Sequence, residues 1–402
     1  MKGIIRLEKK DYLGHLNQLL PFCLVTTARG GSEFLQSLLD NHPQVCTFNT
    51  NFRFFNEYLP ASKTWDSDKT DLSDFIDEFI GVEIHRFKTH YFKTERQDQL
   101  GPNCNQSINI DTNAYRTYFM SIIDDNKITK KSLFLSIYGA YHMSLGYDIL
   151  KTKVLFHHAH ILQEADIYFN EFPQSKLILT TRDPRAAFVS SINHSSSKDG
   201  WFDNYKHVND SLKNLVLERE LFEKLGKDAI IIRLEDTRER TILKSLAAQI
   251  HIDYKDSMKV STWGGLEWWG DRSSPNKLDP RVSKPNTNSW RNKLAKRDKY
   301  ILETVLCNLL IKYQYPCSRK TWIDRALVRI LLFIPLKYEM RHFRLNMILK
   351  KLKIRSGREI MNIISIPYYY LKVRQTLFLY LKFQNKQIWD KWPGDLLKTS
   401  NL

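Results

Sequence analysis

The chain has 402 residues, of which 42% are hydrophobic and 12% aromatic, and its formal net charge is +17 at pH 7. This length allows one large domain with an appendage, or two domains, and excludes a small disulfide-stapled fold. The charge indicates an anionic partner such as a nucleic acid, a membrane surface or a phosphorylated ligand. The five cysteines are scattered and form no CxxC pair, which argues against a disulfide framework or a zinc site and favours a reducing compartment.

Neither a signal peptide nor a membrane span is expected from the hydropathy of the chain. The first 20 residues hold no continuous apolar core, and a secretory signal requires one. No apolar run reaches the ~18 residues of a transmembrane helix. We therefore expect a cytoplasmic protein that could lie peripherally on a membrane.

The first predicted unit, residues 22–45, is a strand, a glycine-containing turn and a helix. Residues 22–25 form a short apolar run with β-favouring residues, and residues 28–32 (ARGGS) interrupt it. A helical apolar stripe follows, and Pro43 stops it because the residue before a proline avoids helical dihedrals. The stripe consists of Phe34, Leu35, Leu38 and Leu39.

This strand–turn–helix unit has the features of a phosphate-binding loop. Glycines let the backbone approach an anion closely, and the free N–H groups at a helix start point toward it. Arg29 adds a permanent cation and Ser32 a hydroxyl donor. The alternative is a turn that needs glycine for packing alone. No GxxxxGK[ST] motif is present, so the spacing is not that of a Walker loop.

Three further strands predict an α/β fold. Residues 153–156, 176–180 and 229–234 are apolar runs, and each precedes a helical pattern, at 161–172, 185–192 and 241–250. Such alternation is typical of a parallel sheet flanked by helices, here of a P-loop-like kind, whose ligands bind at the carboxyl ends of the strands. Arg29, the histidines of 157–160 and Arg182 all follow strands and could share one crevice.

The rest of the chain differs in composition. Residues 261–291 are loop-like but rich in tryptophan, and 298–313 have a helical period. Residues 321–402 carry 16 lysines and arginines against 5 aspartates and glutamates. We expect an α/β domain over 1–320 and a basic amphipathic helical extension over 321–402. Its basic residues could be solvated helix faces, a membrane-surface segment or a nucleic-acid contact, although no nucleic-acid module is recognised.

Two separated motifs, TTARGGSEFLQSLLDNHPQV and KLILTTRDPRAAFVSS, together resemble sulfotransferases of the carbohydrate and bacterial type, which use 3′-phosphoadenosine 5′-phosphosulfate (PAPS). The resemblance implies that the first loop binds the 5′-phosphosulfate, and that Arg182 and Ser190 bind the 3′-phosphate. Late tracts, STWGGLEWWGD and NSWRNKL, look like segments that fold over the nucleotide. The 5′-phosphosulfate residues would be Arg29, Gly30, Gly31, Ser32, Glu33 and Phe34, and the late tract would add Trp290 and Arg291. Glu33 departs from the family pattern, since many members have Ser or Thr there. For Arg182, a structural salt bridge with Asp183 or another acid is the alternative.

The general base is less clearly marked. Several carbohydrate and tyrosine sulfotransferases carry a Glu soon after the HP that ends the first helix, where this chain has Asn49. Other members use a His after the second strand, so His158 and His160, with Arg29, are the candidate catalytic residues. A neutral imidazole suits proton removal from a hydroxyl. The HHAH run could instead hold a metal or be structural, and Glu57 is a further candidate base.

The combined interpretation is a sulfotransferase that moves a sulfuryl group from PAPS to a hydroxyl of a carbohydrate or glycolipid acceptor, with no metal and no nucleic acid. The basic C-terminal region favours a membrane-proximal acceptor. A nucleotide-dependent kinase-like P-loop enzyme is the first alternative. The second is a non-catalytic protein that binds polyanions or membranes.

Overall fold

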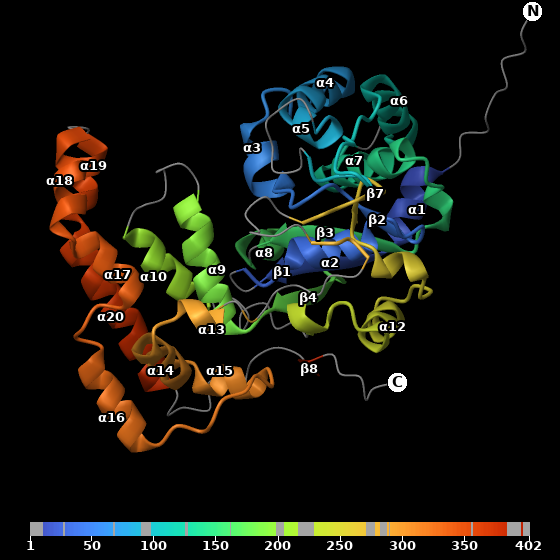
Figure 1. The fold of residues 1–402 in the computed structure, drawn as a ribbon. Helices are drawn as coiled ribbons and strands as arrows, with labels where there is room; N and C mark the ends of the chain where they lie inside the picture. Colours follow the sequence, from blue (N-terminus) through green and yellow to red (C-terminus); the bar gives the residue numbers. More distant parts are fainter. Residues whose placement is uncertain are drawn as a thin grey trace, which may run out of the picture.

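The computed structural model describes residues 11–26, 29–66, 69–89, 98–124, 128–160, 162–197, 205–215, 229–270, 278–281, 288, 290–354, 357–383 and 395–396. Its centre is a six-stranded sheet in the order β2-β3-β1-β4-β5-β8, and every pairing in it is parallel (Figure 1). The strands are β1 (Leu20–Thr26), β2 (Val45–Thr47), β3 (Val154–His160), β4 (Lys176–Thr181), β5 (Ala229–Arg233) and β8 (Asp395–Leu396). The predicted parallel α/β sheet is confirmed.

Helices cover both faces of this sheet. The α-helices before residue 250 are α1 (Tyr12–Gln18), α2 (Ser32–Leu39), α3 (Leu59–Ala61), α4 (Leu72–Val82), α5 (Ile84–Phe87), α6 (Thr112–Ile122), α7 (Lys130–Ser144), α8 (Leu162–Glu171), α9 (Pro184–Ser197), α10 (Lys206–Lys213) and α12 (Arg240–Gln249). Those after it are α13 (Trp290–Lys293), α14 (Lys296–Val305), α15 (Cys307–Lys312), α16 (Trp322–Leu331), α17 (Lys337–Met340), α18 (Leu345–Ile354), α19 (Gly357–Ile364) and α20 (Ile366–Phe383). Short 3₁₀ and π turns complete the described structure: η1 (Phe54–Tyr58), η2 (Ile149–Lys151), η3 (Leu234–Asp236), η4 (Asp256–Lys259) and η5 (Arg341–Phe343).

The histidines of β3 show that α2 and α8 lie on opposite faces of the sheet. Successive side chains of a strand point to opposite sides. His157 stacks on Tyr168 of α8, with 4.5 Å between ring centroids. His158 instead bonds to Gln36 of α2, with 2.8 Å between Nδ1 and Oε1. One strand therefore sends a structural histidine into the core under α8 and a second one toward the loop before α2.

Three predicted segments differ in detail. The expected helix 298–313 is two helices, α14 and α15, with a break at Leu306. The irregular stretch 46–70 contains the end of β2 and the turns η1 and α3. The tryptophan-rich loop contains a hairpin of β6 (Thr262–Trp263) and β7 (Leu266–Glu267), in which Trp263 is buried.

The basic C-terminal region is helical, as expected, and forms a layer beside α10 and α14 at one side of the molecule (Figure 1). Tyr380 of α20 donates to the Leu212 carbonyl at 2.8 Å. Buried Glu339 pairs with Arg374 and accepts from Tyr205. These contacts join the two predicted domains, whose boundary at 320 stays a prediction. Among the described residues, no helix is both long and apolar enough to cross a membrane.

Candidate active site

The glycine turn after β1 requires glycine at Gly31 for two independent reasons. Its φ is +89°, a left-handed conformation that side chains rarely adopt. A Cβ built there would also lie 2.5 Å from Cδ1 of Leu234. The turn thus brings backbone close to the end of β5 and aims the start of α2 at the carboxyl edge of the sheet.

The first turn of α2 offers backbone donors to an anion. Gly31 is the N-cap and provides no side-chain cap, and its carbonyl accepts the first helical bond, from Leu35 N at 3.0 Å. The N–H groups of Ser32, Glu33 and Phe34 precede that first bond, so helix geometry gives them no acceptor within α2. A helix start of this kind, with its dipole, favours a phosphate or sulfate. Glu33 is half-buried in this turn, and its placement gives no account of why an acid stands there.

Arg29 and Arg182 contribute positive charge at the same edge. Arg29 lies close enough to His160 and to Arg182 to lower the pKa of both. The pKa of Arg182, at the end of β4, is lowered chiefly by burial, and Glu235 opposes that shift. Two buried or half-buried guanidinium groups that repel each other are typical of a site that binds a polyanion.

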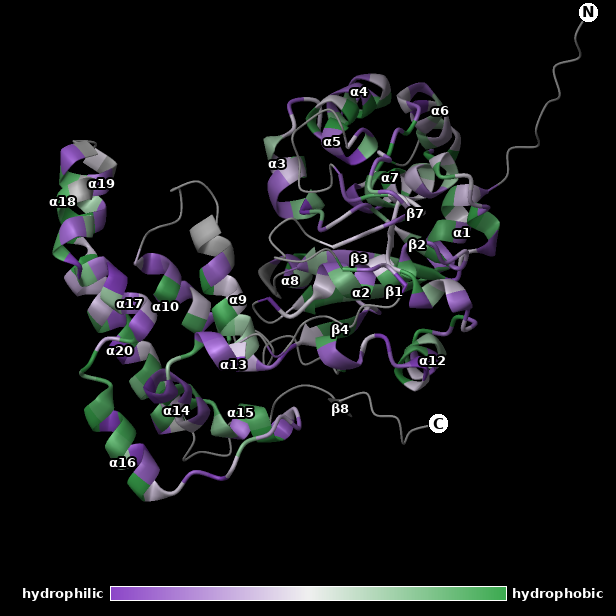
Figure 2. Ribbon diagram, in the orientation of Figure 1, coloured by the Kyte–Doolittle hydropathy of each residue, from purple (hydrophilic) through white to green (hydrophobic). Residues whose placement is uncertain are grey.

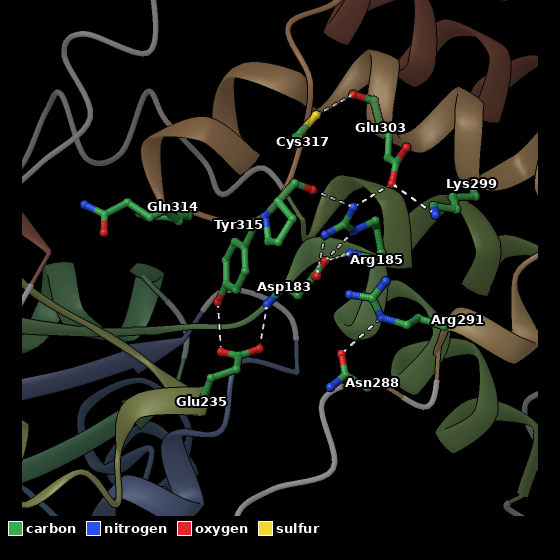
Figure 3. A network of polar contacts seen from close by, with 12 residues as sticks. Asp183, Arg185, Glu235, Asn288, Arg291, Lys299, Glu303, Gln314, Tyr315 and Cys317 are labelled. Carbon is green, nitrogen blue, oxygen red and sulfur yellow. Dashed lines mark hydrogen bonds and ion pairs between the residues drawn. The ribbon is translucent and has the colours of Figure 1, made fainter.

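Glu235, which the sequence did not single out, organises the residues around Arg182. One carboxylate oxygen accepts from the Asp183 N–H at 3.2 Å and the other from the Tyr315 hydroxyl at 2.9 Å (Figure 3). Burial raises its pKa. Its position could have marked Glu235 in the sequence, because it follows β5 as Arg182 follows β4. Asp183 itself pairs with Arg185, so the salt bridge considered between Arg182 and Asp183 is not the main contact of that acid.

Ser190 lies in α9, about two turns beyond the end of β4, and is half-buried. Its neighbour Ser191 contacts Ser211 of α10, with 2.9 Å between the hydroxyl oxygens. Since Ser191 is engaged between helices, Ser190 is the better placed of the two for a ligand near Arg182. This role stays a prediction.

A chain of four polar side chains links α2 to the end of β3. Gln36 bonds to His158, and His158 Nε2 lies 3.4 Å from His160 Nδ1, which is 3.3 Å from the Ser32 hydroxyl. His158 is buried, whereas His160 is half-buried with a φ of +69°. The predicted candidates His158 and His160 are therefore adjacent to each other and to the predicted phosphate loop.

The hydrogen bonds of Gln36 fix the tautomers in this chain. Its amide nitrogen donates to Thr47 Oγ1 at 3.1 Å and to the Phe48 carbonyl at 2.7 Å, so its oxygen must accept from His158 Nδ1–H. His158 Nε2 is then an acceptor, which favours a proton on His160 Nδ1. His160 Nε2 is left with a lone pair.

His160 is neutral at physiological pH. Burial is the main cause that lowers its pKa to about 4, and the charges of Arg29 and Arg53 lower it further. A neutral imidazole with a free Nε2 lone pair can accept a proton from a hydroxyl.

The other predicted contacts have structural neighbours. Trp290 is buried under the Arg185 guanidinium, whose carbon lies 4.3 Å from the ring centroid. Arg291 stacks on Trp290 from α13, and its Nε donates to Asn288 at 3.3 Å (Figure 3). A role of Trp290 and Arg291 toward a nucleotide stays a prediction. Asn49 is buried and donates to the Arg86 carbonyl at 3.2 Å, so it belongs to the core.

A cavity of about 390 Å³ lies beside this edge, between the η1 turn and α4. Arg53 and Glu57, which form an ion pair, belong to its lining. Its other residues are Asn51, Phe52, Tyr58, Ala61, Ser62, Glu78, Val82, Glu83 and Arg86. Glu164 of α8 is buried nearby, within range of the charges of Arg53 and Glu57, and burial raises its pKa to about 7.

Within the described ranges, no group of three His, Cys, Asp or Glu side chains is arranged to hold a metal ion. The histidine run, for which a metal was an alternative, is divided between the two faces of the sheet. His157 forms a hydrogen bond with the Tyr138 hydroxyl, with 2.7 Å between Nδ1 and the hydroxyl oxygen, while His158 faces α2.

Comparison with known proteins identifies the class. A model of the sulfotransferase family matches residues 21–231, more than half of the chain. The chain belongs to the sulfotransferase family and is a sulfotransferase enzyme. Members of this family generally take the sulfuryl group from PAPS.

The chain also shows similarity to solved structures of three sulfotransferases. The domain from the Synechococcus PCC 7002 olefin synthase is 11% identical, covers 79% of this chain and 96% of its own, and has a TM-score of 0.39. The domain from the curacin biosynthetic pathway is 14% identical, with coverages of 79% and 99% and a TM-score of 0.35. Sulfotransferase STF9 from Mycobacterium avium is 13% identical, with coverages of 63% and 70% and a TM-score of 0.31. No curated protein sequence matches the chain.

Proposed function

We propose that this sulfotransferase uses PAPS as donor and transfers the sulfuryl group to a hydroxyl of a carbohydrate or glycolipid. The observation that carries this proposal is the contact between the anion-binding helix start and the neutral histidine. Ser32 Oγ lies 3.3 Å from His160 Nδ1. A bound sulfate would therefore lie beside the imidazole of His160, whose other nitrogen, Nε2, is the proton acceptor.

The donor fits the residues at the sheet edge. The Gly31 turn leaves no room for a Cβ and places the N–H groups of Ser32 to Phe34 in the first turn of α2, which suits the 5′-phosphosulfate. Arg29 would neutralise charge on the same group. Arg182 and Ser190 would hold the 3′-phosphate, which supplies the anchoring for in-line placement.

Proton transfer in this reaction would fall to His160. As the hydroxyl oxygen bonds to sulfur, the bond from sulfur to the phosphate oxygen breaks, and His160 Nε2 takes the hydroxyl proton. The charge that develops on the leaving phosphate lies next to Arg29 and the helix start, where it is stabilised. The products are the sulfate ester and 3′-phosphoadenosine 5′-phosphate (PAP).

The cavity beside η1 supports a sugar acceptor. Its volume of about 390 Å³ lies in the range of small-molecule sites. Glu57, Glu78, Glu83 and two arginines line it, and such side chains are good partners for sugar hydroxyls. Arg53 also influences the pKa of His160, so one residue of the cavity wall lies near the proposed base. A radiolabelled sulfate-transfer screen over sugars and glycolipids would identify the acceptor.

The donor assignment is tested by thermal melting with PAP. A ligand at 100 times its Kd stabilises the folded state by about 2.7 kcal/mol, so the Tm should rise in the presence of PAP. Arg182→Ala should abolish the rise, while Lys151→Ala, which removes an exposed cation just before the amino end of β3, should preserve it. A Tm that is unchanged by PAP but raised by ATP with Mg²⁺ would overturn the PAPS assignment in favour of a kinase-like enzyme.

A further inference from the structure

Exposed hydrophobic side chains are concentrated in the C-terminal helices. Twenty-two large hydrophobic residues are exposed in the described part of the chain, and 17 of them lie between Trp322 and Leu379. The remaining five are isolated, as is normal on a soluble surface: Leu20, Val82, Met120, Leu150 and Ile311. Seventeen exposed residues in one short region require an explanation.

In α16 these residues form a continuous stripe. Ile323, Leu327 and Ile330 follow the i, i+4, i+7 pattern, which places them within one narrow face of the helix, and Ile334 is exposed just beyond its end. Val328 and Leu332 lie on the opposite face and are buried. The helix thus uses one apolar face for the core and presents a second one to solvent. Figure 2 shows α16 as largely hydrophobic at the outer edge of the molecule.

The neighbouring helices repeat this pattern. Leu345, Leu349 and Leu352 form an i, i+4, i+7 stripe on α18. A second such stripe runs from α19 into α20, through Ile364, Tyr368 and Leu371. Contacts hold the layer together, since the Tyr370 hydroxyl donates to the Phe333 carbonyl at 2.6 Å and Phe343 packs edge-on against Tyr370.

The charge around these stripes is positive. Arg329, Lys337, Arg344 and Lys353 are all exposed on the same helices. Two acids of the layer are engaged within the protein. Glu339 is buried against Arg374, and Asp324 caps the start of α16 by accepting from the Thr321 N–H at 2.7 Å. The exposed surface of these helices therefore combines aliphatic and aromatic side chains with an excess of cations.

We propose that α16–α20 form a docking surface for an anionic lipid bilayer. Apolar side chains interleaved with lysine and arginine are the composition of helices that lie in a membrane interface, and anionic headgroups attract the cations. A second copy of the chain is a poorer occupant, because residues 321–402 carry 16 basic against 5 acidic residues and two such faces repel each other. The helices would lie on the surface of the bilayer. The proposal is independent of the sulfotransferase reaction.

Vesicle flotation of the full-length protein tests this surface. We expect binding to vesicles of phosphatidylcholine and phosphatidylglycerol in equal parts, little binding to phosphatidylcholine alone, and release at high salt. Ile323→Gln with Ile330→Gln should weaken binding, whereas Met120→Gln with Leu150→Gln, which alters isolated exposed residues, should not. Arg329→Gln with Arg344→Gln should weaken it by about fivefold for each charge removed. Lys151→Gln with Lys176→Gln is the matched charge control.

Three outcomes would overturn the proposal. One is no flotation with either vesicle, and another is equal weakening by the control variants. The third is a dimer in light scattering that Ile323→Gln with Ile330→Gln dissociates, since a second copy would then cover the surface. The substituted side chains are exposed, so each variant should keep the wild-type melting profile. PAP-induced stabilisation should be unchanged in all of them, which separates loss of docking from loss of the nucleotide site.

Discussion

His160 owes its protonation state to groups on three different elements. Burial at the end of β3 lowers its pKa, and the cations Arg29 and Arg53 lower it further, to about 4. The histidine is therefore neutral over the whole physiological range. A polyanion bound at Arg29 would offset that part of the shift and raise the pKa of His160, which would make it a stronger base when the donor is present.

The tautomer of His160 should depend on Gln36. In the wild-type protein, long-range proton–nitrogen NMR correlations should show the proton on Nδ1 of both His158 and His160. Gln36→Leu removes the acceptor of His158 Nδ1–H, so the orientation of the pair should be lost. Because general bases contribute about 10²–10⁴-fold to rate, we expect an intermediate loss of kcat, roughly tenfold.

Gln36→Glu keeps an acceptor for His158 Nδ1–H, although it loses the amide donor to the Phe48 carbonyl. It should preserve the tautomers and, by adding negative charge, move the acid limb of the kcat profile to higher pH. The sign follows from the low pKa of about 4: activity of the neutral base is lost as the pH falls through the pKa, and an added anion raises that pKa. If both variants show wild-type spectra and pH profiles, Gln36 does not position the base.

At the scale of elements, Arg185 fastens α13 and α14 onto the helix that follows Arg182. It makes two bonds to Asp183, at 2.9 and 2.7 Å, and one to Glu303 of α14 at 2.6 Å (Figure 3). Trp290 of α13 covers its guanidinium. α13 belongs to the late tract that the sequence predicts to fold over the nucleotide. The buried ion pair of Arg185 therefore holds this tract in place.

Arg185→Met should be strongly destabilising. It would leave Asp183 and Glu303 without their main cation in a buried setting, which typically costs about 3–5 kcal/mol. Arg281→Met is the control, because its pair with Glu267 is exposed on the arginine side and such pairs contribute about 0–1 kcal/mol. Urea unfolding measures both variants. Similar free energies of unfolding for the two variants would contradict the role of Arg185 in joining α13 and α14 to α9.

Four strands could be located from the sequence because buried parallel strands are short apolar runs. The ends of β1, β3 and β4 were placed too early, and β3 continues from Phe156 to His160 through polar residues, whereas β5 ends one residue before its predicted end. Those polar ends are where the site lies, and an apolar pattern cannot follow them. β2 and β8 were missed because strands of three and two residues have no measurable period.

The site itself was predictable only where one segment carries its own motif. Arg29, Ser32 and Arg182 follow strands in recognisable motifs, and the sheet places them at one edge. Gln36 and Glu235 act through contacts made by distant elements, so no local pattern marks them. Trp290 was expected to face the nucleotide, and its buried position under Arg185 depends on a long-range contact that sequence spacing does not contain.

At the scale of the whole molecule, the C-terminal region is a candidate membrane surface and also packs against the α/β domain. β8 pairs with β5 in the main sheet. Tyr205, in the α/β part, is buried against Glu339 and stacks on His342 with 5.1 Å between ring centroids. The region therefore stabilises the α/β domain, although every predicted nucleotide contact precedes residue 320.

Truncation after Lys320 separates these two contributions. The shortened protein should melt at a lower temperature, because Tyr205 and the α10 face lose their buried partners. Its affinity for PAP, measured by calorimetry, should stay within about tenfold of the wild type, or about 1.4 kcal/mol, since Arg29, Arg182, Ser190 and His160 remain. Vesicle flotation should be abolished by the same change. A truncated chain that fails to fold, or that folds cooperatively but no longer binds PAP, would contradict a division at residue 320. Either result would make the C-terminal helices an integral part of the catalytic domain.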